Sequence, residues 1–179
     1  TENAMTVRAL YCGGRHLAVG GHGYNPDGEI HHDEMPVAID GALRECLVAG
    51  SLCNDASLAK AGHHWTITGD PTEAALLVVA RKGGLDEHTL QALFPRQDEL
   101  PFDAGRQYMA TAHASDGERI VYVKGALERL LSRLLANSPT TTVLLLGGRV
   151  RGRTLATVDH WATRMLAEFV IDLAFVGAN

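Results

Sequence analysis

Hydrophobic and polar residues alternate along two stretches of the chain in the manner of half-buried strands. Gln107–Ala114 and Arg119–Lys124 show this alternation, and the polar residues Ser115–Glu118 join them as a turn. The pattern predicts a β-hairpin. Near the beginning of the chain, the β-rich segment Thr6–Cys12 ends at a Gly-Gly turn, so His16–Val19 is predicted to pair back onto it.

The clearest helix start lies at Asp70. This residue suits the N-cap, Pro71 suits the first helical position, and Glu73 stands where a capping box places its carboxylate. Apolar residues continue to Arg81, and Gly83-Gly84 is a typical helix end. Further helices are predicted over about Pro36–Leu52, Asp86–Leu93, Ala126–Ala136 and Thr154–Glu168.

The remaining strands predict the fold class. They are expected at Trp65–Thr68, Thr140–Leu146 and Val170–Val176, whereas Gly20–Gly28 reads as a loop with room for a short strand near Gly23. Strands and helices are mixed, and the hairpins require antiparallel pairing. We therefore expect an α+β fold, with one mainly antiparallel twisted sheet flanked by helices.

Length, charge and composition limit the classes of function that this chain can have. A length of 179 residues fits one domain, and a net charge of −5 argues against a nucleic-acid-binding surface. The longest apolar run, Ala74–Ala80, is far shorter than the ~20 residues of a membrane helix. The 3 cysteines form no CxxC pair, so we expect reduced thiols in a cytosolic domain.

A series of short segments resembles, in the same order, motifs of the type II cation-transporting P-type ATPases, the group that includes the calcium pumps. The first segment is similar to the sequence that follows the phosphorylated aspartate in that family. The others are similar to motifs of its nucleotide-binding (N) domain. The segments are Thr1–Val7, Leu52–Ala56, Gly69–Leu76, Leu100–Asp103 with Arg106 and Met109, and Lys124–Glu128.

The resemblance implies that residues 1–179 form a single nucleotide-binding domain excised from a larger membrane pump, with residues 1–5 as a hinge remnant of the phosphorylation domain. Such a domain binds ATP, as Mg-ATP in the intact pump, at the cytoplasmic face of the membrane. Its partners are the phosphorylation and actuator domains of the same parent chain. Because the phosphorylated aspartate would precede Thr1, no catalytic residue is expected in this chain.

The expected nucleotide site combines an aromatic ring with positive charge. By resemblance, Phe102 stacks on adenine, Lys124 lines the inner pocket, and Glu73 and Met109 match further pocket positions. The Glu73 carboxylate suits a hydrogen bond from the adenine amino group or the sugar, or the orientation of a cation. Small residues after Lys124 allow a ligand to approach the backbone closely. The expected ATP-binding residues are Glu73, Phe102, Gln107, Met109, Lys124, Gly125 and Ala126.

Two positions depart from the family pattern. Gln107 stands where the family usually has Lys, and Ile171 stands where it commonly has Arg. Loss of cations facing the phosphates predicts weaker ATP binding, with Arg106 compensating in part. The same losses also suit a second interpretation, a non-catalytic interaction domain whose nucleotide pocket has decayed.

Two other motifs are candidate sites. Gly147–Thr154 has the spacing of a P-loop, with Arg153 in place of Lys, between a predicted strand and a predicted helix. It suggests a P-loop-like nucleotide binder as an alternative function. The histidine-rich segments His31–Glu34 and His63-His64 lack regular ligand spacing, so no metal site is expected.

Overall fold

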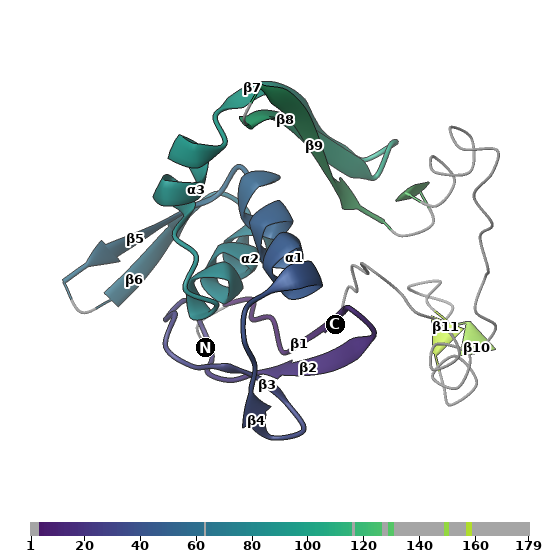
Figure 1. The fold of residues 1–179 in the computed structure, drawn as a ribbon. Coiled ribbons are helices and arrows are strands. Elements are labelled where there is room, and N and C mark those ends of the chain that lie inside the picture. The colour runs from purple at the N-terminus through teal and green to yellow at the C-terminus, as the bar shows by residue number, and fades with distance from the viewer. Residues whose placement is uncertain are drawn as a thin grey trace.

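A pair of helices forms the centre of the described structure, a computed structural model that describes residues 4–62, 64–115, 117–126, 129–130, 149–150 and 157–158. Helix α1 (Gly41–Leu52) packs on α2 (Pro71–Lys82), and the shorter α3 (Glu87–Leu93) contacts both. Small antiparallel sheets surround these helices, and Figure 1 shows two of them on opposite sides of the helix pair.

The first sheet covers one side of the helix pair. It contains β1 (Ala9–Cys12), β2 (Arg15–Val19), β3 (Ile30–His32) and β4 (Met35–Pro36), all antiparallel and in chain order. The predicted N-terminal hairpin is therefore confirmed. The stretch between β2 and β3 is a loop as expected, and it contains no strand near Gly23.

A two-stranded hairpin packs against α2. Strands β5 (Ser57–Ala61) and β6 (His64–Thr68) pair along their whole length, with Leu58 opposite Ile67. Leu58 is buried with Leu77 and Val78 of α2. The expected strand at Trp65–Thr68 is confirmed, whereas its partner β5 was not predicted.

The third sheet carries the predicted central hairpin. Strand β8 (Tyr108–Ser115) lies between β7 (Arg96–Asp103) and β9 (Glu118–Gly125), and it pairs with β9 without a register shift. Four of its residues are buried: Met109, Thr111 and His113, which alternate along the strand, and Ala112. The Thr111 hydroxyl donates to the carbonyl oxygen of Leu52, which ties β8 to the end of α1.

The α+β class is confirmed, but the expectation of one sheet is wrong. The described strands form separate antiparallel sheets of 4, 3, 2 and 2 strands. The reason lies in α1, which is buried on two faces. Leu43 and Leu47 belong to the cluster beneath the first sheet, and Val48 and Leu52 belong to a second cluster with α3 and Tyr122 of β9.

Two predicted helices also differ from the structure. Helix α1 begins at Gly41 rather than near Pro36, because Pro36 pairs with His31 in the first sheet. Thr157–Val158 form strand β11, paired with β10 (Arg149–Val150), where a helix was expected. The predictions for Thr140–Leu146, Val170–Val176, Ile171 and most of Ala126–Ala136 fall outside the described residues. Within the described ranges, no helix combines the length and apolar character needed to span a membrane.

Candidate functional site

The beginning of α2 is fixed by its N-cap residue, as the sequence predicts. One carboxylate oxygen of Asp70 accepts hydrogen bonds from the amides of Thr72, at 2.8 Å, and Glu73, at 3.2 Å. Burial acts to raise the pKa of Asp70, but the hydrogen bonds from Glu73 and Thr72 outweigh it and hold that pKa below its usual value. Glu73 therefore stands on a well-anchored first turn.

The Glu73 carboxylate joins segments that are far apart in the sequence. Its Oε1 forms an ion pair with Lys124 Nζ at 2.8 Å, and its Oε2 accepts from the amide of Asp55 at 3.1 Å. Both charged side chains are mostly buried, with 17% of Glu73 and 20% of Lys124 exposed. The carboxylate thus links α2 to β9 and to the chain after α1. It bonds Lys124 and Asp55 instead of the Asp70 amide, so the predicted capping box is not formed.

A buried amide holds Glu73 in place from below. Asn54 Nδ2 donates to the carbonyl oxygens of Gly50 and Glu73, both at 2.9 Å, and its Oδ1 accepts from the amide of Ala56. The Asn54 side chain therefore connects the end of α1 to the start of α2. A buried amide with its polar atoms satisfied is a rigid support.

Arg96 of β7 reinforces the same junction. Its Nη2 donates to the carbonyl oxygens of Leu52 and Asn54, and its Nη1 pairs with the carboxylates of Asp55 and Glu99, each at 2.8 Å. Burial acts to lower the pKa of Arg96, but the hydrogen bonds that it donates to Asp55 and Glu99 outweigh burial and raise that pKa. This one guanidinium anchors β7, the strand that carries Phe102, to the segment beside Glu73.

Phe102 is an exposed aromatic ring next to this junction. Phe102 is 61% exposed. In the register of β7 on β8, Leu100 lies opposite Ala110 and Asp103 lies opposite Tyr108, so the irregular stretch between them runs alongside Met109. The ring is thus presented to solvent near the paired residues Met109 and Lys124.

Met109 forms the floor of this region. It is 2% exposed and pairs in register with Lys124 of β9. The Cys53 thiol contacts the Met109 carbonyl oxygen at 3.8 Å. Burial raises the pKa of Cys53, with the Thr111 hydroxyl and the Lys124 charge acting in the opposite direction. Cys53 is therefore a protonated, buried thiol that packs beneath the site.

Gln107, Gly125 and Ala126 meet at the end of the hairpin. The Ala126 amide donates to the Gln107 carbonyl oxygen at 2.9 Å, and Gln107 itself adopts a left-handed φ of 61°. A Cβ on Gly125 would overlap the Cβ of Tyr108 and the carbonyl oxygen of Gln107. Glycine is thus required for the two strands to approach this closely.

Sequence reasoning missed three polar residues that the structure brings to this region. Asn54 and Arg96 support Glu73, and Arg129 donates from its Nε to Gln107 Oε1 at 3.0 Å. Asn54 lies within a recognised motif, although its role was not inferred. Glu99, three positions after Arg96, is a local acceptor, but nothing in the local sequence identifies the distant acceptors of Arg96 at Leu52, Asn54 and Asp55 or that of Arg129 at Gln107.

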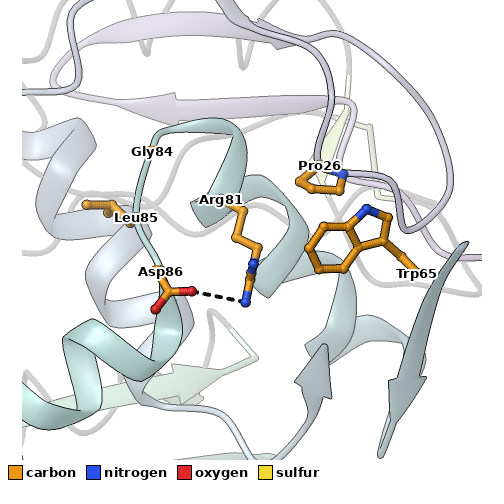
Figure 2. A pocket seen from close by; sticks show the side chains of 6 residues that line it. All are labelled: Pro26, Trp65, Arg81, Gly84, Leu85 and Asp86. Carbon is orange, nitrogen blue, oxygen red and sulfur yellow. Dashed lines mark ion pairs between the residues drawn. The ribbon is translucent and has the colours of Figure 1, made fainter. Parts of the chain in front are cut away.

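A separate concavity of about 280 Å³ lies at the other end of α2 (Figure 2). Its lining residues are Pro26, Trp65, Arg81, Gly84, Leu85 and Asp86. The Arg81 guanidinium lies 5.0 Å from the Trp65 ring and pairs with Asp86 at 3.0 Å and Glu87 at 2.7 Å. Its charge is thus already matched, and none of the expected ATP-binding residues lines this concavity.

Comparison with known proteins identifies the domain. Residues 42–168 match the family described as "P-type ATPase, cytoplasmic domain N". The chain belongs to this family. The match includes every residue of the junction described above, from Asn54 to Arg129, and it implies the N-domain fold.

Relatives of this N domain are named as cation or calcium transporters. It is 49% identical over 140 residues to "Cation-transporting ATPase pma1" of Synechocystis, which covers 74% of this chain and 15% of the relative. It is 42% identical over 134 residues to "Probable cation-transporting ATPase F" of Mycobacterium tuberculosis, covering 73% and 15%. It is 30% identical over 174 residues to "Calcium-transporting ATPase" of Bacillus subtilis, covering 96% and 20%. The chain thus spans a fifth or less of the length of these relatives.

The structure gives little support to the P-loop-like segment or to a metal site at the histidine-rich segments. Of the P-loop-like segment, only Arg149–Val150 is described, and Thr157–Val158 is a strand where the P-loop reading needs a helix. Among the residues that the structure describes, no group of three or more His, Cys, Asp or Glu is arranged to hold a metal ion.

Proposed function

We propose that this N domain binds ATP at the junction of α2 with the β8–β9 hairpin. The observation that carries the proposal is the Glu73–Lys124 ion pair, whose Lys124 lies opposite Met109 in the same three-stranded sheet as the exposed Phe102. An exposed ring offers a stacking surface for adenine, and aromatic stacking contributes about 1–3 kcal/mol per base. A cation and a carboxylate next to that ring supply the polar contacts that orient a nucleotide.

Each proposed contact follows from the position of the side chain. Phe102 stacks on the base, Glu73 accepts from the adenine amino group or the sugar, and Lys124 attracts the phosphates. Met109 supplies the apolar floor. Gly125 and Ala126 leave room for the ligand near the backbone, and Gln107 lies at the rim. We assign no catalytic group to this chain.

At the level of the parent protein, we propose an ATP-driven cation pump. In this proposal the N domain holds Mg-ATP at the cytoplasmic face of a membrane. It presents the terminal phosphate to the phosphorylation domain, and the actuator domain of the same parent chain completes the cycle. Residues 1–5 would form the hinge toward the phosphorylation domain, and residues 1–179 would act as one nucleotide-binding unit.

The test is a titration of the ¹⁵N-labelled chain with ATP, with and without Mg²⁺, followed by amide NMR. The expected result is a set of shifts centred on Glu73, Phe102 and Lys124 that also appears without Mg²⁺. Shifts that are centred on Gly147–Thr154 and require Mg²⁺ would contradict the proposal in favour of a P-loop-like site. No shifts at millimolar ATP would indicate an interaction domain with a decayed pocket.

A further inference from the structure

The strongest unassigned feature near the proposed site is a guanidinium at the rim. Arg129 lies just beyond β9, and its amide and that of Leu130 both donate to the Ala126 carbonyl oxygen, at 3.0 and 3.1 Å. Ala126 in turn donates to Gln107 at the end of the β8–β9 hairpin. These backbone hydrogen bonds place Arg129 beside the residues that form the rim.

The side chain of Arg129 is held by a neutral partner. Its Nε donates to Gln107 Oε1 at 3.0 Å, which orients the guanidinium without cancelling its charge. The two terminal nitrogens then remain as donors toward solvent within the described part of the chain. A planar fork of N–H groups matches the geometry of phosphate oxygens.

The other cationic side chains of this sheet are already bound to carboxylate or carbonyl groups of the chain. Lys124 pairs with Glu73, Arg96 with Asp55 and Glu99, and Arg119 with Asp98. Arg106 donates to the carbonyl oxygen of Pro101, within its own turn. Among the described cations of β7–β9 and the turn after β9, Arg129 is exposed and has no carboxylate partner.

We infer that Arg129, oriented by Gln107, binds the polyphosphate of the nucleotide. The inference rests on the proposed ATP site and adds to it a phosphate-binding residue supplied by the chain after β9. It also changes the interpretation of glutamine at position 107, where the family usually has lysine. The glutamine does not simply remove a cation from the rim, because its amide oxygen holds the guanidinium of Arg129 there.

The test compares ATP with adenosine, which shares the base and sugar but lacks phosphate. The ¹⁵N-labelled chain and its variants Arg129→Ala, Arg129→Lys and Arg119→Ala are titrated with each ligand at low and moderate salt. Arg119→Ala is the matched control, since it removes an exposed arginine from the same sheet at the far end of β9. The amide spectrum of each variant without ligand shows that its fold is intact.

The expected result for Arg129→Ala is ATP binding weakened about threefold to tenfold, with a shallower salt dependence and adenosine affinity unchanged within about twofold. Arg129→Lys should retain part of the ATP affinity because it keeps the charge without the planar fork. Arg119→Ala should bind both ligands as the unaltered chain does.

Two outcomes would overturn the inference in distinguishable ways. If adenosine and ATP both shift the amides of Phe102 and Glu73, and Arg129→Ala weakens ATP no more than Arg119→Ala does, only the role of Arg129 fails. If neither ligand shifts those amides in the unaltered chain, the proposed ATP site fails, and the role of Arg129 fails with it.

Discussion

Glu73 and Lys124 are 51 positions apart in the sequence, yet their charged groups meet at 2.8 Å between the start of α2 and the end of β9. Because both side chains are mostly buried, removing one of them leaves the other charge unpaired and poorly solvated, which costs more than breaking a surface salt bridge. We expect a double-mutant cycle with Glu73→Gln and Lys124→Met to give a coupling energy of about 1–2 kcal/mol in urea unfolding.

The control for this cycle is the exposed pair of Arg119 with Asp98 at 3.0 Å. Their side chains are 57% and 68% exposed, so the coupling energy should be below about 0.5 kcal/mol. A coupling between Glu73 and Lys124 no larger than that of the control pair would mean that their contact does not stabilise the junction.

Phe102 gives the most direct test of the adenine-binding surface. Because its ring is exposed, Phe102→Ala should change the free energy of unfolding by less than about 0.5 kcal/mol. Loss of base stacking should weaken ATP binding about tenfold, measured by calorimetry or NMR titration. Val121→Ala is the control, since Val121 is an exposed apolar residue on β9 of the same sheet and should leave ATP affinity unchanged.

Arg96 tests whether the support beneath Glu73 matters. Arg96→Met keeps an apolar stem but removes the donor to the Asn54 carbonyl oxygen and one of the two donors to the Leu52 carbonyl oxygen, which keeps the Thr111 hydroxyl. We expect a loss of about 2–3 kcal/mol in the free energy of unfolding, because unsatisfied buried acceptors are costly. If Arg96→Met unfolds at the same urea concentration as the unaltered chain, the junction does not depend on this guanidinium.

Gly125 tests the close approach at the end of the hairpin. Gly125→Ala should destabilise the chain by at least about 2 kcal/mol, because the new Cβ would overlap Tyr108 and the Gln107 carbonyl group. Gly50→Ala is the control, since Gly50 lies in α1 and its Cβ would meet only Leu76 at 3.7 Å. Alanine there should be neutral or stabilising by up to about 1 kcal/mol. Thermal unfolding of both variants measures the difference.

Elements governed by local rules could be predicted from the sequence. The β8–β9 hairpin follows from alternation and a polar turn, and α2 follows from the Asp70 cap and the Pro at the next position. Strands β5 and β7 were not predicted, because their sequences lack a local pattern of this kind. Each lies at a sheet edge, and β5 buries one residue while β7 buries none, so neither shows alternation.

The site could be predicted only as far as motifs identify residues. Motifs singled out Glu73 and Lys124, and the structure brings them together. Apart from the pair with Glu99 at i+3, the Arg96 contacts could not be predicted, because the other acceptors are the Asp55 carboxylate and two backbone carbonyl oxygens 41, 44 and 42 positions away. The separate sheets follow from tertiary packing on both faces of α1, which no single segment reveals.

His113 predicts a specific pH dependence of stability. Its side chain is 1% exposed, its Nδ1 lies 2.9 Å from the Phe94 carbonyl oxygen, and its Nε2 lies 2.9 Å from the Thr111 hydroxyl. Burial lowers the pKa of His113 below its ordinary value, with the Phe94 hydrogen bond acting in the opposite direction. The folded ring therefore stays neutral at a pH where the unfolded ring takes up a proton, near 6.5 and below.

Because the unfolded state binds the additional proton, the free energy of unfolding should fall as the pH decreases from about 7.5 through 6.5 toward 5. This window lies above the acid range in which Asp70 and Asp86 take up protons, since their pKa values are lowered from 3.8. His113→Gln removes the titrating group, so its stability should change less between pH 7.5 and 5 than that of the unaltered chain. Replacing the exposed His22 by Gln is the control, because that ring is solvated in both states. Equal pH slopes for His113→Gln and the unaltered chain, measured by urea unfolding, would show that His113 does not control the acid response.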